Sequence, residues 1–257
     1  MHPLTIVKVG GKIVEENSSL NRLLQDFSAL DGNKLLVHGG GRSATALASQ
    51  LGIESKMVNG RRITDAEMLK VVTMVYGGLV NKNIVAGLQA MGANALGLTG
   101  ADLNIMRSEK RPIKEVDYGF VGDVKEVSAQ LLSSLIGEGV VPVLAPLTHD
   151  MKGNLLNTNA DVIAGEAAKA LAGFFDVTLV FCFEKKGVLE DENDDDSVIP
   201  VITPSLYEQY VLQGVIQGGM IPKLDNAFEA LRCGVKKVVI TEASQLGKNA
   251  GTTVILQ

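Results

Sequence analysis

Two lysines at opposite ends of the chain each lie beside a glycine-rich turn, and they are the residues best suited to chemistry in this sequence. Lys8 lies in an apolar run that ends directly in the pair Gly10-Gly11. Lys223 closes the segment Gly-Gly-Met-Ile-Pro-Lys at residues 218–223, where a helix is expected to begin. Glycine turns let backbone N–H groups approach an anion, a helix N-terminus adds its dipole, and lysine supplies compact positive charge. The pattern predicts a site that transfers a phosphoryl group.

A third glycine turn strengthens this interpretation. It has the sequence His-Gly-Gly-Gly-Arg at residues 38–42 and again follows an apolar run. A glycine pair alone is commonly just a tight turn, but three turns that carry two lysines and an arginine favour anion binding. Lys8 is unlike an ordinary strand residue, because burying a lysine in an apolar strand costs free energy unless its charge is paired. This cost favours a functional role for Lys8.

A polar cluster, Asn-Thr-Asn-Ala-Asp at residues 157–161, precedes a helical pattern. Asn157, Asn159 and Asp161 alternate as they would at the end of a strand. Asp161 taken alone is best explained as the N-terminal cap of the helix. The functional alternative is that its carboxylate pairs with both lysines and holds them in position.

An arginine pair, Arg61-Arg62, follows the turn Asn59-Gly60. Arginine binds carboxylates through two parallel hydrogen bonds, so the pair indicates a substrate that carries a carboxylate. A solvated surface pair is the structural alternative.

The remaining reactive residue types carry less information. His38 is expected to pack under the turn that follows it, and Cys182 and Cys233, which show no metal-binding spacing, are expected to be buried thiols. The acidic run at residues 191–196 is most simply a solvated loop. The sequence contains neither a Gly-x-x-x-x-Gly-Lys-Ser/Thr loop nor a Gly-x-Gly-x-x-Gly fingerprint, so a phosphate site must be assembled from separate turns.

Composition limits the possible partners. The 257 residues carry a formal net charge of -5, which argues against nucleic acid, because its phosphates need a basic face. The apolar runs, such as residues 177–183, are shorter than the roughly 18 residues of a membrane span. No long apolar stretch opens the chain as in a signal peptide. We therefore expect a cytoplasmic protein that binds small molecules and neither nucleic acid nor membrane.

Apolar strand patterns alternate with helical patterns along the whole chain. Strands are predicted at residues 4–9, 34–37, 93–98, 140–144, 177–183 and 236–241. Helices are predicted at residues 18–30, 43–50, 65–89, 128–136, 161–171, 206–212 and 224–233. Continuously apolar strands are buried on both faces, which predicts a mainly parallel sheet between helices, shared by both halves of the chain. The polar, turn-rich segment 104–124 is expected to form a hairpin or lid over one end of the sheet.

Five motifs, taken in chain order, resemble the amino-acid kinase family. They are Lys-Val-Gly-Gly at 8–11, His-Gly-Gly-Gly-Arg at 38–42, Asn-Gly-Arg-Arg-Ile-Thr-Asp at 59–65, Asn-Thr-Asn-Ala-Asp at 157–161 and Gly-Gly-Met-Ile-Pro-Lys at 218–223. The resemblance extends from Leu4 to Ile255 and covers almost the whole chain. Within the family, the motifs look most like those of the members that phosphorylate an N-acylated glutamate in arginine biosynthesis.

The resemblance implies a three-layer αβα sandwich around a largely parallel sheet, of the carbamate kinase-like type. It also implies an N-terminal lobe, residues 1–172, that binds the acylglutamate and forms dimer contacts. The C-terminal lobe, residues 173–257, would bind ATP.

The same resemblance implies roles for individual residues. Lys8 and Lys223 would stabilise the charge of the migrating phosphoryl group, and Asp161 would organise the two lysines. The substrate would be held by Gly40, Gly41, Arg62 and Asn157. The nucleotide and its phosphates would contact Gly10, Gly11, Glu184, Gly187 and Leu189.

The implied reaction is transfer of a phosphoryl group from ATP to the γ-carboxylate of N-acetyl-L-glutamate. This carboxylate is ionised at neutral pH, since a free Glu titrates near ~4.3, so no general base is needed. Lysines and backbone amides can place the groups in line and neutralise the spreading charge. Mg²⁺ can be held mainly by the ATP phosphates and water, so no protein metal site is expected.

Two places depart from the family pattern. Phe183 and Glu184 occupy positions where a small polar residue and an Asp are usual, which bears on the nucleotide contacts. Arg61 occupies a position where an apolar residue is usual. This extra cation suggests N-succinyl-L-glutamate as an alternative substrate, in which Arg61 would meet the added carboxylate. A non-catalytic, ligand-sensing relative is the alternative of another class, and the presence of both lysines with Asp161 argues against it.

The resemblance also bears on assembly. Arginine-inhibited hexameric members of the family carry an extra helix before the first strand, whereas here the first strand is expected from Leu4. We therefore expect a homodimer that arginine does not inhibit. The long helical pattern at residues 65–89, with its pair Gly77-Gly78, is the expected dimer contact, because glycines allow close backbone approach.

Overall fold

One large sheet runs through the whole molecule. The computed structural model describes residues 1–58, 60–248 and 250–257. In this part of the chain, eight strands form a sheet with the order β12-β14-β13-β11-β1-β2-β8-β5. Their bounds are β1 Pro3–Val9, β2 Asn33–His38, β5 Ala95–Leu98, β8 Val141–Leu144, β11 Asp176–Phe183, β12 Val201–Ile202, β13 Lys237–Glu242 and β14 Thr252–Val254. Neighbouring strands are parallel except for β13 and β14, so the predicted mainly parallel sheet is confirmed.

The two halves of the chain meet at the pair β1–β11 in the middle of this sheet. The register places Lys8 beside Phe181 and Val9 beside Cys182. This pairing confirms the prediction that both halves share one continuous sheet. Both strands are almost continuously buried, which agrees with the apolar runs from which they were predicted.

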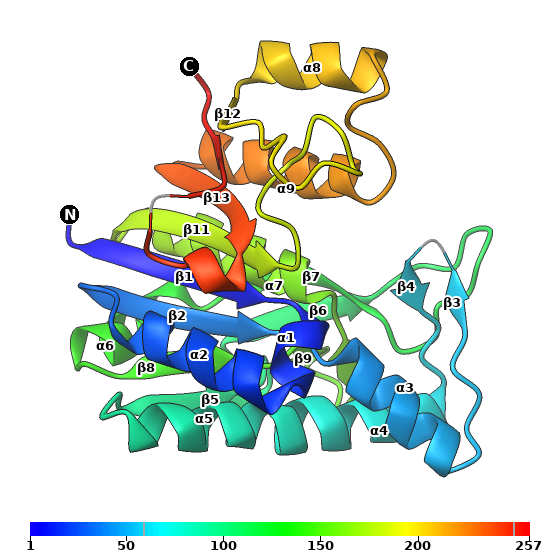
Figure 1. Ribbon diagram of the computed structural model, residues 1–257. Helices are drawn as coiled ribbons and strands as arrows, with labels where there is room; N and C mark the ends of the chain where they lie inside the picture. The colour runs from blue at the N-terminus through cyan, green and yellow to red at the C-terminus, as the bar shows by residue number, and fades with distance from the viewer. Residues whose placement is uncertain (59, 249) are drawn as a thin grey trace.

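Helices cover both faces of the sheet (Figure 1). Their bounds are α1 Gly11–Glu15, α2 Asn17–Ser28, α3 Gly41–Gln50, α4 Ala66–Val72, α5 Asn81–Ala90, α6 Ala129–Gly137, α7 Ala160–Leu171, α8 Pro204–Leu212 and α9 Met220–Arg232. Two cores result, because successive side chains of a strand point to opposite faces. Val7 and Val9 pack with α2, α4 and α5 on one face, whereas Leu4 and Ile6 pack with α6, α7 and α9 on the other. The predicted αβα sandwich is confirmed.

Lys8 belongs by this alternation to the face that carries Leu4 and Ile6. That face is covered by α7, whose first turn contains Asp161. The strand parity therefore directs the Lys8 side chain toward Asp161.

Smaller sheets stand at the edge of the large one, near the carboxyl ends of its strands. The predicted hairpin consists of β6 Met106–Lys110 and β7 Gly122–Val127, which pair in antiparallel fashion. In the described chain these strands join β9 Leu147–His149 and β10 Leu155–Asn157 in a second sheet. A further hairpin, β3 Met57–Val58 with β4 Arg61–Arg62, stands apart in Figure 1. The short strands β3, β4, β9 and β10, each of two or three residues, were not predicted as separate elements, because they are too short to show a periodicity.

The long helical pattern at residues 65–89 is confirmed as a continuous helix from Ala66 to Ala90. Asp65 caps it, since its Oδ1 accepts a hydrogen bond of 2.8 Å from Met68 N. The segment Thr73–Val80, with Gly77-Gly78, is π-helical. By length and composition alone this helix is long and apolar enough to cross a membrane, although no single apolar run within it is that long. One face of this helix, with Met68, Val71, Val72, Val75, Ile84 and Leu88, is buried in the protein core.

The two cysteines differ in environment. Cys182 is buried in β11, as predicted, and burial raises the pKa of its thiol to about 12. The prediction for Cys233 is wrong, because this residue is exposed. It directly follows the last residue of α9, and the helix end turns it toward solvent.

His38 is fully buried beneath the glycine turn, as predicted. Its Nδ1 lies 2.7 Å from Gly39 O and its Nε2 lies 3.2 Å from Asn81 Nδ2. Because Asn81 Nδ2 is a donor, Nε2 accepts and Nδ1 carries the proton of a neutral ring. Burial lowers the pKa of His38 to about 4, although its bond to Gly39 O opposes the shift.

This buried imidazole predicts an acid-dependent loss of stability. The folded-state pKa lies below the unfolded value of about 6.5, so the unfolded chain binds more protons between these two values. The free energy of unfolding is therefore highest above pH 6.5 and falls by roughly 3 kcal/mol as the pH drops toward 4. Denaturant unfolding of wild type and His38→Gln across this range measures the difference, since carboxylates titrate equally in both proteins. Parallel stability curves would contradict the assignment.

Candidate active site

The glycine turns predicted to bind phosphate meet at the carboxyl ends of β1 and β2. Gly10 and Gly11 connect β1 to α1, and Gly39 to Gly41 connect β2 to α3. A Cβ atom placed on Gly11 would lie 3.6 Å from the amide nitrogens of both Gly40 and Gly41. The turns thus face each other across one small space, at the edge where parallel sheets bind ligands.

The backbone amides of these turns are used differently. Gly11 and Gly41 are the first residues of α1 and α3, so their N–H groups have no acceptor within the helix. The Gly10 N–H donates to Cys182 O at 3.1 Å. This amide therefore joins β1 to β11, and the amides of Gly11 and Gly41 are the ones left without a helix partner beside the turns. At Gly40 a side chain is excluded, since a Cβ would lie 2.9 Å from the ring of the buried Tyr76.

Lys8 and Asp161 form an ion pair in which Lys8 Nζ lies 2.7 Å from Asp161 Oδ1. Both side chains are largely buried, with exposed fractions of 14% and 17%. The cap of α7 is Asn159, whose Oδ1 accepts from Asp161 N at 2.7 Å. The prediction that Asp161 caps the helix is wrong, because the cap lies two residues earlier. The Asp161 carboxylate is therefore free to pair with Lys8.

Lys223 lies in the first turn of α9 and approaches the same region from the C-terminal half. Its Nζ lies 4.5 Å from the centroid of the Phe183 ring. Burial lowers the pKa of Lys223, while the charge of Asp161 raises it and the charge of Lys8 lowers it further. The two lysines are therefore near enough to act on each other electrostatically. Among the described residues, Asp161 pairs with Lys8 and Lys223 has no ion-pair partner within 4.0 Å.

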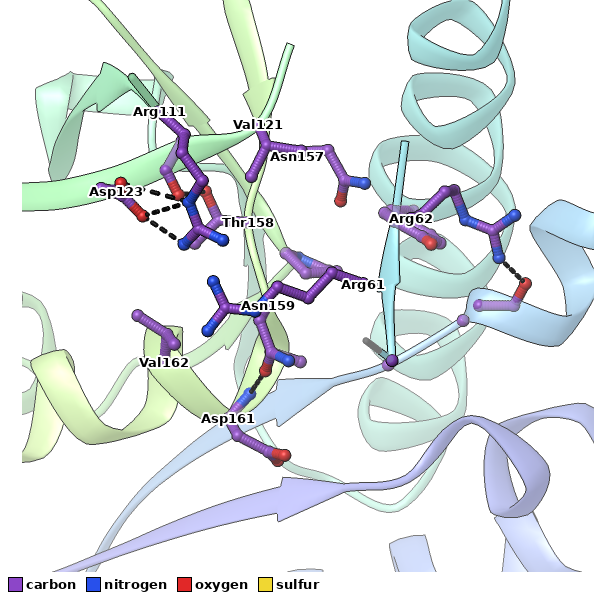
Figure 2. Close-up of a pocket in the computed structure, with 18 of the residues that line it drawn as sticks. Arg61, Arg62, Arg111, Val121, Asp123, Asn157, Thr158, Asn159, Asp161 and Val162 are labelled. Atoms are coloured by element: carbon purple, nitrogen blue, oxygen red, sulfur yellow. Dashed lines mark hydrogen bonds and ion pairs between the residues drawn. The ribbon is translucent and has the colours of Figure 1, made fainter. Parts of the chain in front are cut away.

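Arg62 is nearly buried beside the glycine turn of β2. Its Nη2 donates to Gly41 O at 2.7 Å and to Thr45 Oγ1 at 2.9 Å, and Nη1 donates to Ser55. Arg61 is exposed, and Figure 2 shows its side chain extending across the pocket toward Asn159, opposite in direction to Arg62. The two arginines diverge because they are successive residues of β4. Asn59, in the same motif, lies outside the described residues.

One pocket collects most of the residues predicted to bind substrate or to act in catalysis (Figure 2). Of the predicted residues it contains Lys8, Gly40, Gly41, Arg62, Asn157 and Asp161. The sequence missed Arg111 and Asp123, which form an ion pair on the β6–β7 hairpin and line the opposite wall. Four cationic and two anionic side chains line the pocket, which leaves an excess of two positive charges. This excess matches a ligand with two carboxylates.

A second pocket adjoins the first and shares Gly41 and Arg62 with it. It is lined by Gly10, Gly11 and Glu184, all predicted to contact nucleotide, and by Phe183, Lys12 and Arg42. Glu184 Oε2 lies 2.9 Å from Lys12 Nζ, and its Oε1 lies 3.6 Å from Arg42 Nη2. Two cations at the helix starts thus gather around one carboxylate beside the glycine turns.

Two residues predicted to contact nucleotide line neither pocket. At Gly187 a Cβ would lie 2.7 Å from Thr252 Oγ1, which also accepts from Val188 N at 2.8 Å. Leu189 is buried and forms a bridge with Val198. In this structure both residues serve the packing of the C-terminal half.

The sequence of the chain matches a known family. The model of the amino acid kinase family matches residues 3–242. The chain belongs to the amino acid kinase family. Proteins named acetylglutamate kinase from Phocaeicola vulgatus and Bacteroides thetaiotaomicron are each 74% identical to this amino acid kinase over 251 residues, covering 98% of both chains. One of the same name from Parabacteroides distasonis is 73% identical over 254 residues, covering 99% of this chain and 100% of the relative.

Solved structures agree on the fold of this amino acid kinase. Smu.665 from Streptococcus mutans has 27% identity and a TM-score of 0.82, with 99% of each chain covered. N-acetylglutamate synthase from Neisseria gonorrhoeae, solved with coenzyme A and N-acetyl-glutamate, has 20% identity and a TM-score of 0.82, covering 99% of this chain and 59% of that chain. Carbamate kinase from Giardia lamblia bound to AMP-PNP has 15% identity, a TM-score of 0.68, and 99% and 98% coverage. The last two show likeness of fold alone.

Proposed function

We propose that this amino acid kinase transfers the γ-phosphoryl group of ATP to the γ-carboxylate of N-acetyl-L-glutamate in arginine biosynthesis. The observation that carries the proposal is the placement of both lysines beside the glycine turns, next to a pocket with two excess positive charges. Lys8 is held there by Asp161 at 2.7 Å, and Lys223 lies over Phe183, which lines the pocket of Gly10 and Gly11. The full-length relatives named acetylglutamate kinase support the choice of substrate.

The pocket offers separate partners for the two carboxylates of the substrate. Arg62 is held by Gly41 O and Thr45 and can present its remaining N–H groups to the α-carboxylate. The Asn157 amide, which donates to Thr64 Oγ1 at 2.9 Å, stands on the same wall. The γ-carboxylate would then extend toward Lys8 and the turns that carry Gly11 and Gly41.

The transfer itself needs charge stabilisation and no general base. An oxygen of the ionised γ-carboxylate attacks the γ-phosphorus, the new O–P bond forms, and the bond to the β-phosphate oxygen breaks with its electron pair leaving on ADP. Lys8 and Lys223 would neutralise the charge that spreads over the transferred group. Asp161 orients Lys8 through the 2.7 Å ion pair. His38 is neutral and already engaged on both ring nitrogens, so it is not a base here.

The donor set of the site fits Mg²⁺ that arrives with ATP. Among the described residues, no group of three His, Cys, Asp or Glu side chains could hold a metal ion. The carboxylates that line the two pockets, Asp123, Asp161 and Glu184, are each paired with a lysine or arginine. Such a site suits an ion carried by the triphosphate and its waters. When bound, Mg²⁺ would neutralise charge on the β- and γ-phosphate oxygens.

We further propose that the two halves of the chain bind different substrates. Residues 1–172 would bind the acylglutamate and form the dimer contact, and residues 173–257 would bind ATP. The acylglutamate pocket is lined by residues of the first range alone, which supports this division. We also propose that the enzyme works in the cytoplasm on small molecules and without nucleic acid or membrane, consistent with the net charge of -5.

Removing the Lys8 amine tests the proposed reaction. Lys8→Ala is expected to lower kcat by about 10²- to 10³-fold, as for loss of one donor to a developing charge, with little change in acylglutamate binding. The assay traps the acyl phosphate with hydroxylamine in the presence of ATP, Mg²⁺ and N-acetylglutamate. Lys169→Ala is the matched control, because Lys169 is ion-paired on α7 outside both pockets and its loss should leave kcat unchanged. If wild type binds ligands but yields no hydroxamate, the ligand-sensing alternative is favoured.

Arg61 tests which acyl group the pocket prefers. Arg61 extends into the pocket, so a carboxylate on the acyl group can meet it. Arg61→Ala should lower kcat/KM for N-succinylglutamate about tenfold more than for N-acetylglutamate, as expected for one charge-assisted hydrogen bond. Kinetics with both substrates measure the ratio, with Arg107→Ala as the control outside the pocket. An unchanged ratio rules out a role of Arg61 in acyl selection.

The long helix predicts the dimer contact. Met74 and Leu79 on this helix are 51% and 59% exposed, although both are large apolar side chains. Multi-angle light scattering of the purified enzyme should give twice the chain mass of 27.2 kDa. Replacing both residues with lysine should give monomers, because a buried apolar contact does not tolerate two added charges. A wild-type monomer or hexamer, or a double variant that stays dimeric, would refute this contact.

A further inference from the structure

Phe183 lies where the two halves of the site meet. It is the last residue of β11. Its Cβ lies close to Gly10 in the turn after β1, because a Cβ atom added to Gly10 would be 3.9 Å from it. The side chain packs against the core shared by α7 and α9. It lines the pocket of Gly10 and Gly11 but not the pocket of Arg62 and Asn157 that is assigned to acylglutamate.

The charges of the site leave Lys223 without a carboxylate of its own. Asp161 is occupied by Lys8 at 2.7 Å, and in the described residues Lys223 forms no ion pair within 4.0 Å. Lys223 is partly buried, so its ammonium has lost part of its hydration, and this burial lowers its pKa. The group that its Nζ approaches is the face of the Phe183 ring, 4.5 Å from the centroid.

We propose that Phe183 is a positioning residue that holds the Lys223 ammonium in the site through its ring face. This inference depends on the proposed kinase function, in which Lys223 neutralises the transferred group. An aromatic face attracts a cation through its quadrupole but carries no net charge. It therefore fixes the place of Lys223 and leaves the full positive charge for phosphate, which a carboxylate in the same position would cancel.

The position of the ring suits this task. The β1–β11 register sets Cys182 beside Val9, so Phe183 stands next to the turn that follows the strand of Lys8. The ring has few rotatable bonds and is anchored in the core, so it costs little entropy to hold it in one orientation. Phe183 thus fixes Lys223 of the C-terminal half relative to Lys8 of the N-terminal half.

Fluorinated phenylalanines at position 183 test the proposal without changing the packing. The 4-fluoro, 3,5-difluoro and 3,4,5-trifluoro analogues, inserted in the full-length enzyme by stop-codon suppression, progressively weaken the negative ring face. We expect kcat to fall stepwise, by about tenfold for the trifluoro analogue, which is the range of a largely desolvated cation–π contact. The KM for N-acetylglutamate should not change. Phe120, whose ring lies 5.1 Å from Lys110 Nζ outside both pockets, is the matched control, and its fluorination should leave kcat unchanged.

A second readout does not need kinase activity. Competitive acetylation of the nucleotide-free protein, followed by mass spectrometry across pH, reports when Lys223 becomes deprotonated. Fluorination of Phe183 should shift this midpoint to lower pH, because the ring then stabilises the ammonium less. If wild type makes no acyl phosphate but the midpoint shifts, the proposed function fails and the contact stands.

The opposite results overturn the inference. An active enzyme whose kcat and Lys223 midpoint do not change along the fluorine series shows that Phe183 does not position the cation. The same conclusion follows if Phe183→Leu lowers kcat while the fluorine series stays flat, because the ring then acts only by filling space.

Discussion

The ion pair between Lys8 and Asp161 is the interaction on which the site depends. A lysine in the central strand of a buried sheet is unfavourable unless its charge is matched, and Asp161 matches it at 2.7 Å. Asp161 can do so because Asn159 caps α7 instead and leaves the first-turn carboxylate free. The pair therefore ties β1 to α7 and fixes the amine at the carboxyl end of the sheet.

The distribution of charge around this pair explains why the region suits an anion. Arg111 forms an ion pair with Asp123. Glu184 forms ion pairs with Lys12 and Arg42, which lie at the starts of two helices. Lys8, Lys12, Arg42 and Arg111 are thus paired with carboxylates when no substrate is bound, which limits the cost of bringing these cations together. In the proposed reaction, an incoming carboxylate or phosphate would meet a surface that is already arranged for it, and this preorganisation is what transfer chemistry requires.

The sequence was most informative where a long pattern determines the structure. The buried strands at residues 4–9 and 177–183 and the helix from residue 65 could be predicted because each pattern covers enough residues to have a clear period. The grouping of the Lys8 and Asp161 motifs could be predicted because parallel strands end at one edge of the sheet and because the family resemblance orders the motifs.

The contacts that could not be predicted depend on strand register, on exact helix bounds and on packing between separate elements, none of which a sequence pattern specifies. The contact of Arg111 with Asp123 needs the hairpin register, which shifts at a bulge between Arg107 and Ser108. The choice of Asn159 over Asp161 as the cap depends on the exact residue at which α7 begins. No periodicity in the sequence predicts that the ring of Phe183 lies under Lys223, because the two residues belong to separate elements, β11 and α9.

The alternation of β1 has a consequence for how this strand can vary. Ile6 and Lys8 face α7, whereas Val7 and Val9 face the opposite core. Deleting or inserting one residue before Lys8 would turn its amine into an apolar core and bring a valine to Asp161. A length change in this strand therefore keeps Lys8 on the face of α7 only when it adds or removes an even number of residues.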